Sequence, residues 1–121
     1  MGLDMYAFTT NQDIPPADFD EPRDSGELFH WRKHPNLHGW MEWIYFKRGG
    51  QNRDFNSSRV QLEPVHLDAL EQAIRRDELP RTTGFVFGES RPEESQRDFE
   101  FVRKAREALK VGKRVFYIGY W

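Results

Sequence analysis

Three histidines and one glutamate recur at intervals of four residues in a short segment of this chain. They are His30, His34, His38 and Glu42. Residues four apart lie on one face of a helix, and imidazole and carboxylate groups are ligands that zinc accepts. A site made of His34, His38 and Glu42, with its fourth position open, would suit a small metal-dependent hydrolase. The spacing therefore allows a metal site with zinc as its candidate ion, as an alternative to the leading hypothesis, and no cofactor is predicted.

A proline inside the same segment limits this interpretation. Pro35 is well placed as the first residue of a helix, and the residue before a proline disfavours helical backbone angles. His30 and His34 then need not face the same way as His38 and Glu42. The spacing also differs from the His-Glu-x-x-His pattern of zinc metalloproteases. The alternative is that these histidines are structural, with His34 bonding free amides at the start of a helix.

Residues 30–53 are also basic and rich in aromatic rings. Five Lys and Arg residues accompany one acid, Glu42, and five aromatic residues are interspersed among them. Basic groups beside aromatic platforms are typical of proteins that bind single-stranded nucleic acid. The leading hypothesis is a non-enzymatic binding module that engages a macromolecular partner, either a protein or single-stranded nucleic acid. Its candidate binding residues are Trp31, Arg32, Lys33, His34, His38 and Trp40.

Other features of the sequence argue against a functional site, both within residues 30–53 and elsewhere in the chain. An aromatic stripe at helical spacing usually packs inward, so a purely structural role for the tryptophans and histidines is the third hypothesis. Residues 82–90 (TTGFVFGES) lack the spacing and the lysine of a phosphate-binding loop. Ser90 has no histidine near it in sequence, so no nucleophilic triad is predicted. Ser90 is expected instead to cap the helix that follows it.

The composition limits which classes of protein this chain can belong to. The 121 residues are expected to form one domain over residues 1–121, with an aromatic share of 15% that supplies much of the core. The net charge of −2 argues against general attraction to nucleic acid or to an anionic membrane. The absence of cysteine excludes disulfides and thiolate chemistry. Without a leader-like or spanning segment, a cytoplasmic protein with no membrane partner is predicted.

Hydrophobic spacing predicts an α+β fold, in which a single layer of three to four mostly antiparallel strands packs with three helices. Strands are expected at residues 3–8, 60–62 and 114–121, with a further strand or buried loop within 82–90. The first and last strands are expected to be neighbours at the centre of the sheet. Helices are expected to begin at Pro35, at Pro64 and after Ser90, a short helical piece is expected at residues 27–33, and residues 9–27 form an acidic loop.

Hydrophobic spacing also predicts which residues of each helix are buried and which strand edge is exposed. The buried stripes of the three helices are Leu37, Trp40, Met41 and Ile44, then Leu67, Leu70 and Ile74, then Phe99, Val102, Ala105 or Arg106, and Leu109. Residues 59–63 are expected to form an exposed edge whose polar side chains disfavour pairing with a second copy. A monomer is therefore predicted.

Four motifs give the chain a resemblance to a known family. They are the opening MGLDMY, WRKHPNLHGW at residues 31–40, TGFVFGES at residues 83–90, and KAREAL at residues 104–109 followed by RVFY at residues 114–117. In these motifs the chain resembles a family of small bacterial and phage proteins that begin with Gly-Leu-Asp-Met-Tyr. The resemblance covers nearly the whole chain and implies no particular activity. It implies a phage-related or mobile-element setting, in which small modules often bind host or viral macromolecules.

Overall fold

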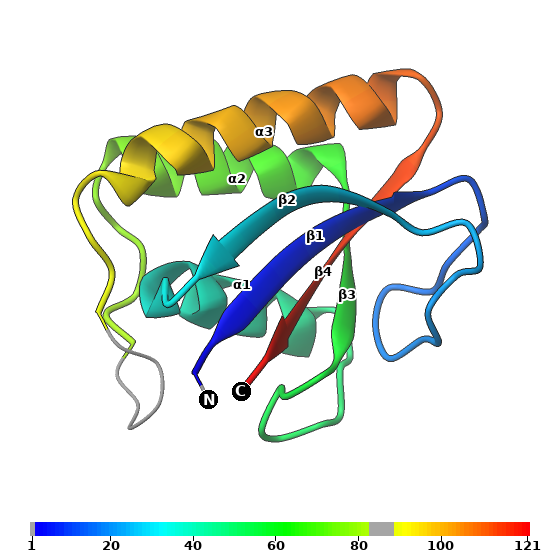
Figure 1. Cartoon of the computed structure of the whole chain (residues 1–121), viewed down its shortest axis with the longest axis horizontal. Helices are drawn as coiled ribbons and strands as arrows, with labels where there is room; N and C mark the ends of the chain where they lie inside the picture. The colour runs from blue at the N-terminus through cyan, green and yellow to red at the C-terminus, as the bar shows by residue number, and fades with distance from the viewer. Residues whose placement is uncertain (1, 83–88) are drawn as a thin grey trace.

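The computed structural model describes residues 2–82 and 89–121, and within them one sheet packs against three helices. The strands are β1 (Asp4–Thr10), β2 (Gly26–Arg32), β3 (Arg59–Leu62) and β4 (Arg114–Tyr120), and the helices are α1 (Pro35–Lys47), α2 (Pro64–Arg75) and α3 (Glu94–Lys110). Every strand pairing is antiparallel, in the order β2-β1-β4-β3 (Figure 1). The predicted α+β fold class is confirmed.

The first and last strands pair at the centre of the sheet. Asp4 lies opposite Tyr120, and the register continues without a break to Thr10 and Arg114. The interior of β4 is buried on both faces, which explains why its sequence is an unbroken apolar run. The predicted central position of these two strands is confirmed.

The helices cover one face of the sheet. In Figure 1 the sheet lies in front of α1, while α2 and α3 run side by side across the upper part of the molecule. Met5 and Ala7 of β1 point toward the helices and are fully buried. The predicted stripes of α1 and α2 are confirmed, because all seven of their residues are buried. In the part of the chain that the structure describes, no helix combines the length and the apolar character needed to cross a membrane.

Helix α3 is rotated relative to its predicted stripe. Phe99 and Leu109 are only partly buried, whereas Phe101 and Ala108 belong to the core. Asp98, which apolar spacing would place on the outside, is 1% exposed. The rotation follows from the partners of Asp98, described below, which draw this face of the helix inward.

The short helix predicted at residues 27–33 is wrong, because this segment is strand β2. Phe29 and Trp31 point into the core while His30 points to the opposite face, which is the two-residue alternation of a strand. Pairing with β1 satisfies the backbone groups on one side of the segment, and Tyr6 lies opposite His30.

The acidic loop between β1 and β2 covers the outer edge of β3. The Asp18 amide donates to the Arg59 carbonyl at 3.0 Å, and the Gln61 amide donates to the Pro16 carbonyl at 2.9 Å. The edge predicted to be exposed at residues 59–63 is therefore paired along part of its length. This pairing hinders the addition of a strand from another chain to the edge of β3.

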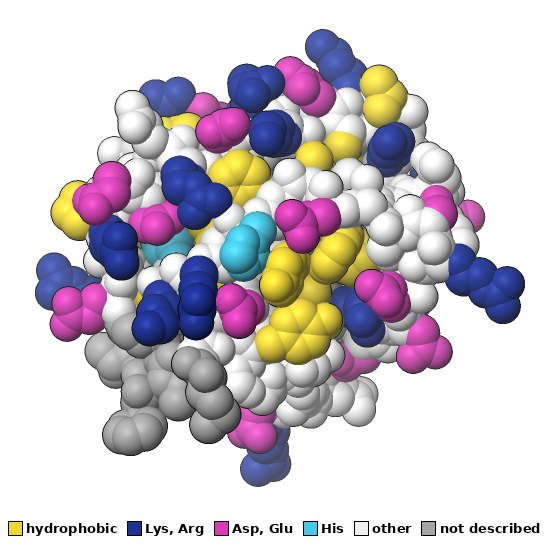
Figure 2. All heavy atoms as spheres, viewed as in Figure 1, with side chains coloured by type: hydrophobic (Ala, Val, Ile, Leu, Met, Phe, Trp, Pro, Cys, Tyr) yellow, Lys and Arg dark blue, Asp and Glu magenta, His cyan; other side chains and the backbone are white. Residues whose placement is uncertain are grey.

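The face of the sheet opposite the helices is aromatic. The Tyr6 ring stacks on His30 at 4.7 Å between centroids and on Phe8 at 5.8 Å, and its edge contacts Tyr120. Figure 2 shows a cluster of hydrophobic side chains beside a histidine, with charged groups around them. The strand or buried loop predicted within residues 82–90 falls mainly on residues 83–88, which lie outside the described residues.

Candidate functional site

Most of the predicted binding residues lie inside the protein. Trp31 is fully buried, and His34, His38 and Trp40 are each at most 5% exposed. Arg32 and Lys33 are exposed. The four buried side chains therefore cannot present an aromatic platform to a macromolecule. The two basic residues, Arg32 and Lys33, are exposed without these rings beside them on the surface.

The three regularly spaced histidines point in three directions. His30 lies on the aromatic face of the sheet, His34 faces α3, and His38 faces β4. His34 precedes the helix with φ −116° and ψ 71°, because Pro35 takes the first helical position. The structure does not bring the predicted metal ligands His34, His38 and Glu42 together: among the described residues, His34 is grouped with two carboxylates of α3 instead.

His38 is held in the core beside Tyr117. Its Nδ1 lies 2.6 Å from the Tyr117 hydroxyl, and its ring stacks on Phe55 at 5.0 Å. Burial lowers the pKa of His38 from 6.5 to about 4, and burial raises the pKa of Tyr117 well above 10. Both groups are therefore neutral near pH 7, and a hydrogen bond joins Nδ1 to the Tyr117 hydroxyl. Burial also raises the pKa of Glu42.

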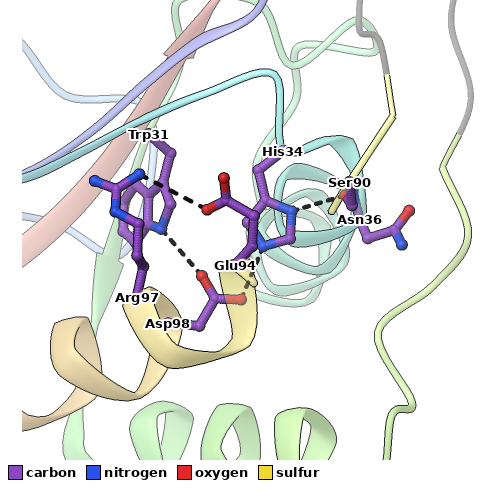
Figure 3. A network of polar contacts seen from close by, with 7 residues as sticks. All are labelled: Trp31, His34, Asn36, Ser90, Glu94, Arg97 and Asp98. Atoms are coloured by element: carbon purple, nitrogen blue, oxygen red, sulfur yellow. Dashed lines mark hydrogen bonds and ion pairs between the residues drawn. The ribbon is translucent and has the colours of Figure 1, made fainter. Parts of the chain in front are cut away.

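His34 joins two residues that are far from it in sequence. Its Nδ1 lies 2.7 Å from Ser90 Oγ, and its Nε2 lies 2.8 Å from Asp98 Oδ2. The second oxygen of Asp98 accepts a hydrogen bond from Trp31 Nε1 at 3.0 Å. Figure 3 shows this series of contacts running from the end of β2, through the residue before α1, to the first turns of α3.

Local backbone geometry explains how His34 reaches this position. Lys33, directly after β2, has a φ of +55°, and its amide donates to the Leu3 carbonyl at 2.9 Å. This turn reverses the chain before Pro35 starts α1. Ser90 Oγ accepts a hydrogen bond from the Asn36 amide at 3.0 Å. Ser90 therefore caps α1 across the fold, and the prediction that it caps α3 is wrong, since Glu93 is the residue that precedes α3.

The neighbouring donors fix the directions of the hydrogen bonds. The Asn36 amide and the Trp31 indole can only donate, so Ser90 Oγ and Asp98 Oδ1 accept from them. The Ser90 hydroxyl is then free to donate to His34 Nδ1, while Nε2–H donates to Asp98. We assign this tautomer from the hydrogen-bond network. It places a hydroxyl, an imidazole that accepts its proton, and a carboxylate that orients the imidazole in one line.

A hollow of about 700 Å³ opens beside these residues. His34 and Asp98 form its buried wall, half-buried Ser90 and Glu94 lie between that wall and solvent, and Arg91 is exposed. Other residues that line it are Asn36, Ile74, Asp77, Leu79, Arg81, Thr82, Glu89, Pro92 and Ser95. The lining is mixed in charge, with apolar side chains from the end of α2.

Sequence analysis missed Ser90, Glu94 and Asp98 as partners of His34. Ser90 is 56 residues and Asp98 is 64 residues from this histidine, and no local spacing relates them. One signal was present. Asp98 precedes Phe101, Val102 and Ala105 by three, four and seven residues, so it begins the true buried stripe of α3. A carboxylate at the head of an apolar stripe indicates a buried polar partner elsewhere.

Comparison with known proteins adds no assignment to this geometry: no family model, no curated protein and no solved structure matches the chain.

Proposed function

We propose that the protein is a hydrolase of acyl bonds, such as esters, with Ser90 as nucleophile, His34 as general base and Asp98 as the residue that orients His34. The observation that supports this proposal is the continuous line from Ser90 Oγ through His34 to Asp98, with separations of 2.7 and 2.8 Å at the wall of an open hollow. Nucleophile, base and orienting carboxylate at these distances match the roles of the serine-hydrolase triad, with the two ring nitrogens exchanged, since Nδ1 faces the serine and Nε2 faces the carboxylate.

The proposed reaction conserves every proton. Ser90 Oγ attacks the carbonyl carbon of the substrate while its proton passes to His34 Nδ1, giving a tetrahedral intermediate. The intermediate expels the leaving group, which takes the proton from Nδ1, and an acyl-serine remains. Water then attacks the acyl-serine, loses a proton to Nδ1, and releases the acid as Ser90 Oγ recovers that proton. Asp98 accepts from Nε2–H throughout and stabilises the positive charge on the imidazole.

The start of α1 supports the same chemistry. The Asn36 amide donates to Ser90 Oγ, so it holds this oxygen at the start of α1 and leaves the hydroxyl hydrogen to point to His34 Nδ1. The positive end of the helix dipole lies at the same place and would favour the oxyanion of a tetrahedral intermediate formed beside Ser90. Trp31 holds the second oxygen of Asp98, which keeps the carboxylate aligned with the imidazole.

The direct test is hydrolysis of p-nitrophenyl acetate together with labelling by a fluorophosphonate, which reacts with activated serine hydroxyls. We expect wild-type protein to react with both, and Ser90→Ala to lose labelling and at least about 100-fold in kcat/KM. Asp98→Asn is expected to lose a similar factor, because it disturbs the tautomer of His34. Ser57→Ala, an exposed serine in a distant turn, is the matched control.

The outcome that contradicts the proposal is equally clear. If Ser90→Ala hydrolyses the ester as fast as wild type and the label attaches elsewhere or nowhere, Ser90 is only a helix cap. Because Ser90 also bonds the Asn36 amide, thermal unfolding of each variant must be measured alongside. A loss of activity counts only where the variant remains folded at the assay temperature.

A binding role stays as a second proposal, now centred on the outer face of α1. Trp43 is 51% exposed and Phe46 is 43% exposed, and Lys47 Nζ lies 4.4 Å from the centroid of the Trp43 ring. A cation beside exposed rings is the combination that single-stranded nucleic acid uses. Fluorescence anisotropy of a labelled oligonucleotide should show salt-sensitive binding that Trp43→Ser weakens. Equal anisotropy curves for the two proteins would refute it.

A further inference from the structure

A second carboxylate lies within reach of the His34–Asp98 pair. Glu94 stands four residues before Asp98 on α3, so both side chains project from one face of the helix. The ligand atoms of His34, Glu94 and Asp98 all lie within 4.8 Å of one another. Figure 3 shows the Glu94 carboxylate beside the imidazole ring. Three groups that bind cations thus converge at the inner wall of the hollow.

The position of Glu94 is unusual for an acid without a metal. Its Oε2 is buried and makes no hydrogen bond to the described residues, and its only ionic contact among them is Arg97 Nη1 at 3.7 Å. A buried carboxylate oxygen loses hydration and needs compensation. A bound cation would supply it, because it would neutralise part of the negative charge of two neighbouring carboxylates.

From this geometry we infer that His34 Nε2, Asp98 Oδ2 and Glu94 form a site for one divalent transition-metal ion of the zinc class, and that this ion inhibits the triad. One imidazole nitrogen with two carboxylate oxygens suits zinc, whereas calcium and magnesium prefer oxygen ligands alone. Tetrahedral zinc with bonds of about 2.0–2.1 Å sets neighbouring ligand atoms about 3.3 Å apart. The present 2.8 Å between Nε2 and Oδ2 would open by about 0.5 Å.

The surrounding residues already support the ligands. Trp31 Nε1 holds the other oxygen of Asp98, and Ser90 Oγ lies against the other nitrogen of His34. Hydrogen bonds of this kind orient the ligands in most metal sites. Three protein ligands leave one position on the ion open to water.

The inhibitory effect rests on the proposed function and follows from the two nitrogens of one ring. An ion on Nε2 occupies the lone pair there, so the neutral ring carries its hydrogen on Nδ1. Nδ1–H then donates to Ser90 Oγ, and His34 has no lone pair left with which to take the serine proton. The ion thus requires the His34 tautomer with its hydrogen on Nδ1, whereas the nucleophile requires the tautomer with its hydrogen on Nε2. Zinc and ester hydrolysis are mutually exclusive at this site.

The test combines two measurements on untagged protein: calorimetric titration with zinc chloride, and the rate of p-nitrophenyl acetate hydrolysis with and without zinc. We expect wild type to bind one zinc ion per chain and to lose at least about 90% of its rate when saturated. Glu94→Gln should bind at least about tenfold more weakly, so its ratio of rates with and without zinc rises toward one at the same concentration. Glu93→Gln, an exposed neighbour, should keep the wild-type affinity and ratio.

Ser90→Ala separates this inference from the proposed function. It should still bind one zinc ion per chain, because the serine supports His34 through a hydrogen bond but is not itself a ligand. If Ser90→Ala is inactive but Glu94→Gln binds zinc like wild type, the metal site is wrong and the hydrolase stands. If Glu94→Gln loses zinc but Ser90→Ala is fully active, the metal site stands, and the hydrolase and the inhibition are both wrong. Hydrolysis that requires zinc would overturn the inhibition, since the ion would then be catalytic.

Discussion

The buried histidine of α1 makes a quantitative prediction about stability and pH. Burial lowers the pKa of His38 from 6.5 to about 4 in the folded protein. The unfolded chain therefore binds a proton more readily than the folded one, and protonation favours unfolding. The contribution is fully present above pH 6.5, falls as pH drops through 6.5, and is exhausted below about 4. Its full size is about 3 kcal/mol, and about 2 kcal/mol of it is lost between pH 7.5 and pH 5.

Urea denaturation at a series of pH values measures this loss. Because burial also lowers the pKa of half-buried His66, the wild-type curve contains a second contribution in the same range. The comparison is therefore between wild type and His38→Gln, in which the decrease in unfolding free energy from pH 7.5 to 5 should be about 2 kcal/mol smaller. His66→Gln is the control and should retain the contribution of His38.

A direct reading of His38 needs no substitution. Its ring carbons, followed by NMR as pH is lowered, should keep the shifts of neutral imidazole down to about pH 5. Titration of this ring near pH 6.5 in the folded protein would refute the reasoning. An unchanged pH dependence in a folded His38→Gln variant would refute it independently.

Two further predictions concern close packing and buried hydrogen bonds. Gly119→Ala should lower the unfolding free energy by about 1–3 kcal/mol, because a Cβ there would lie 2.9 Å from the His38 ring and from the Tyr117 hydroxyl. Gly26→Ala is the control and should change the unfolding free energy little, because its Cβ would lie 3.6 Å from the nearest atom. Equal urea midpoints for the two glycine variants would contradict this. Trp31→Phe should cost about 1–3 kcal/mol more than Trp40→Phe, because it leaves Asp98 Oδ1 without its indole donor. A similar cost for both tryptophan variants, again from urea midpoints, would show that this hydrogen bond is unimportant.

The parts of the fold that were predictable depend on local patterns. Pro35 and Pro64 each start a helix, and the apolar residues that follow them recur at the spacing of a buried face. The apolar run at residues 114–121 indicated a strand covered on both sides, and β4 has that position. These elements follow from the preferences of neighbouring residues, so one sequence is enough to find them.

The site was not predictable from the sequence in the same way. The contacts of His34 with Ser90 and Asp98 depend on how α1 and α3 pack against the sheet, and no periodicity records that packing. The regular spacing of His30, His34 and His38 was misleading, because a strand, a turn and a helix share those nine residues. The strand β2 was missed for a related reason. Trp31 faces inward between half-buried His30 and exposed Arg32, and a strand that ends in charged residues resembles a solvated helix.

The position of β4 has a consequence for how the chain acquires its structure. The strand that completes the centre of the sheet follows all the other elements in sequence, and β1 and β3 both pair with it. While the chain is being synthesised, β1 and β3 therefore lack their shared neighbour, and the core beneath them stays open until residues 114–120 leave the ribosome. Folding on the ribosome should consequently be late and abrupt. A nascent chain from which β4 has not yet emerged should be far more sensitive to protease than one in which β4 is outside the ribosome.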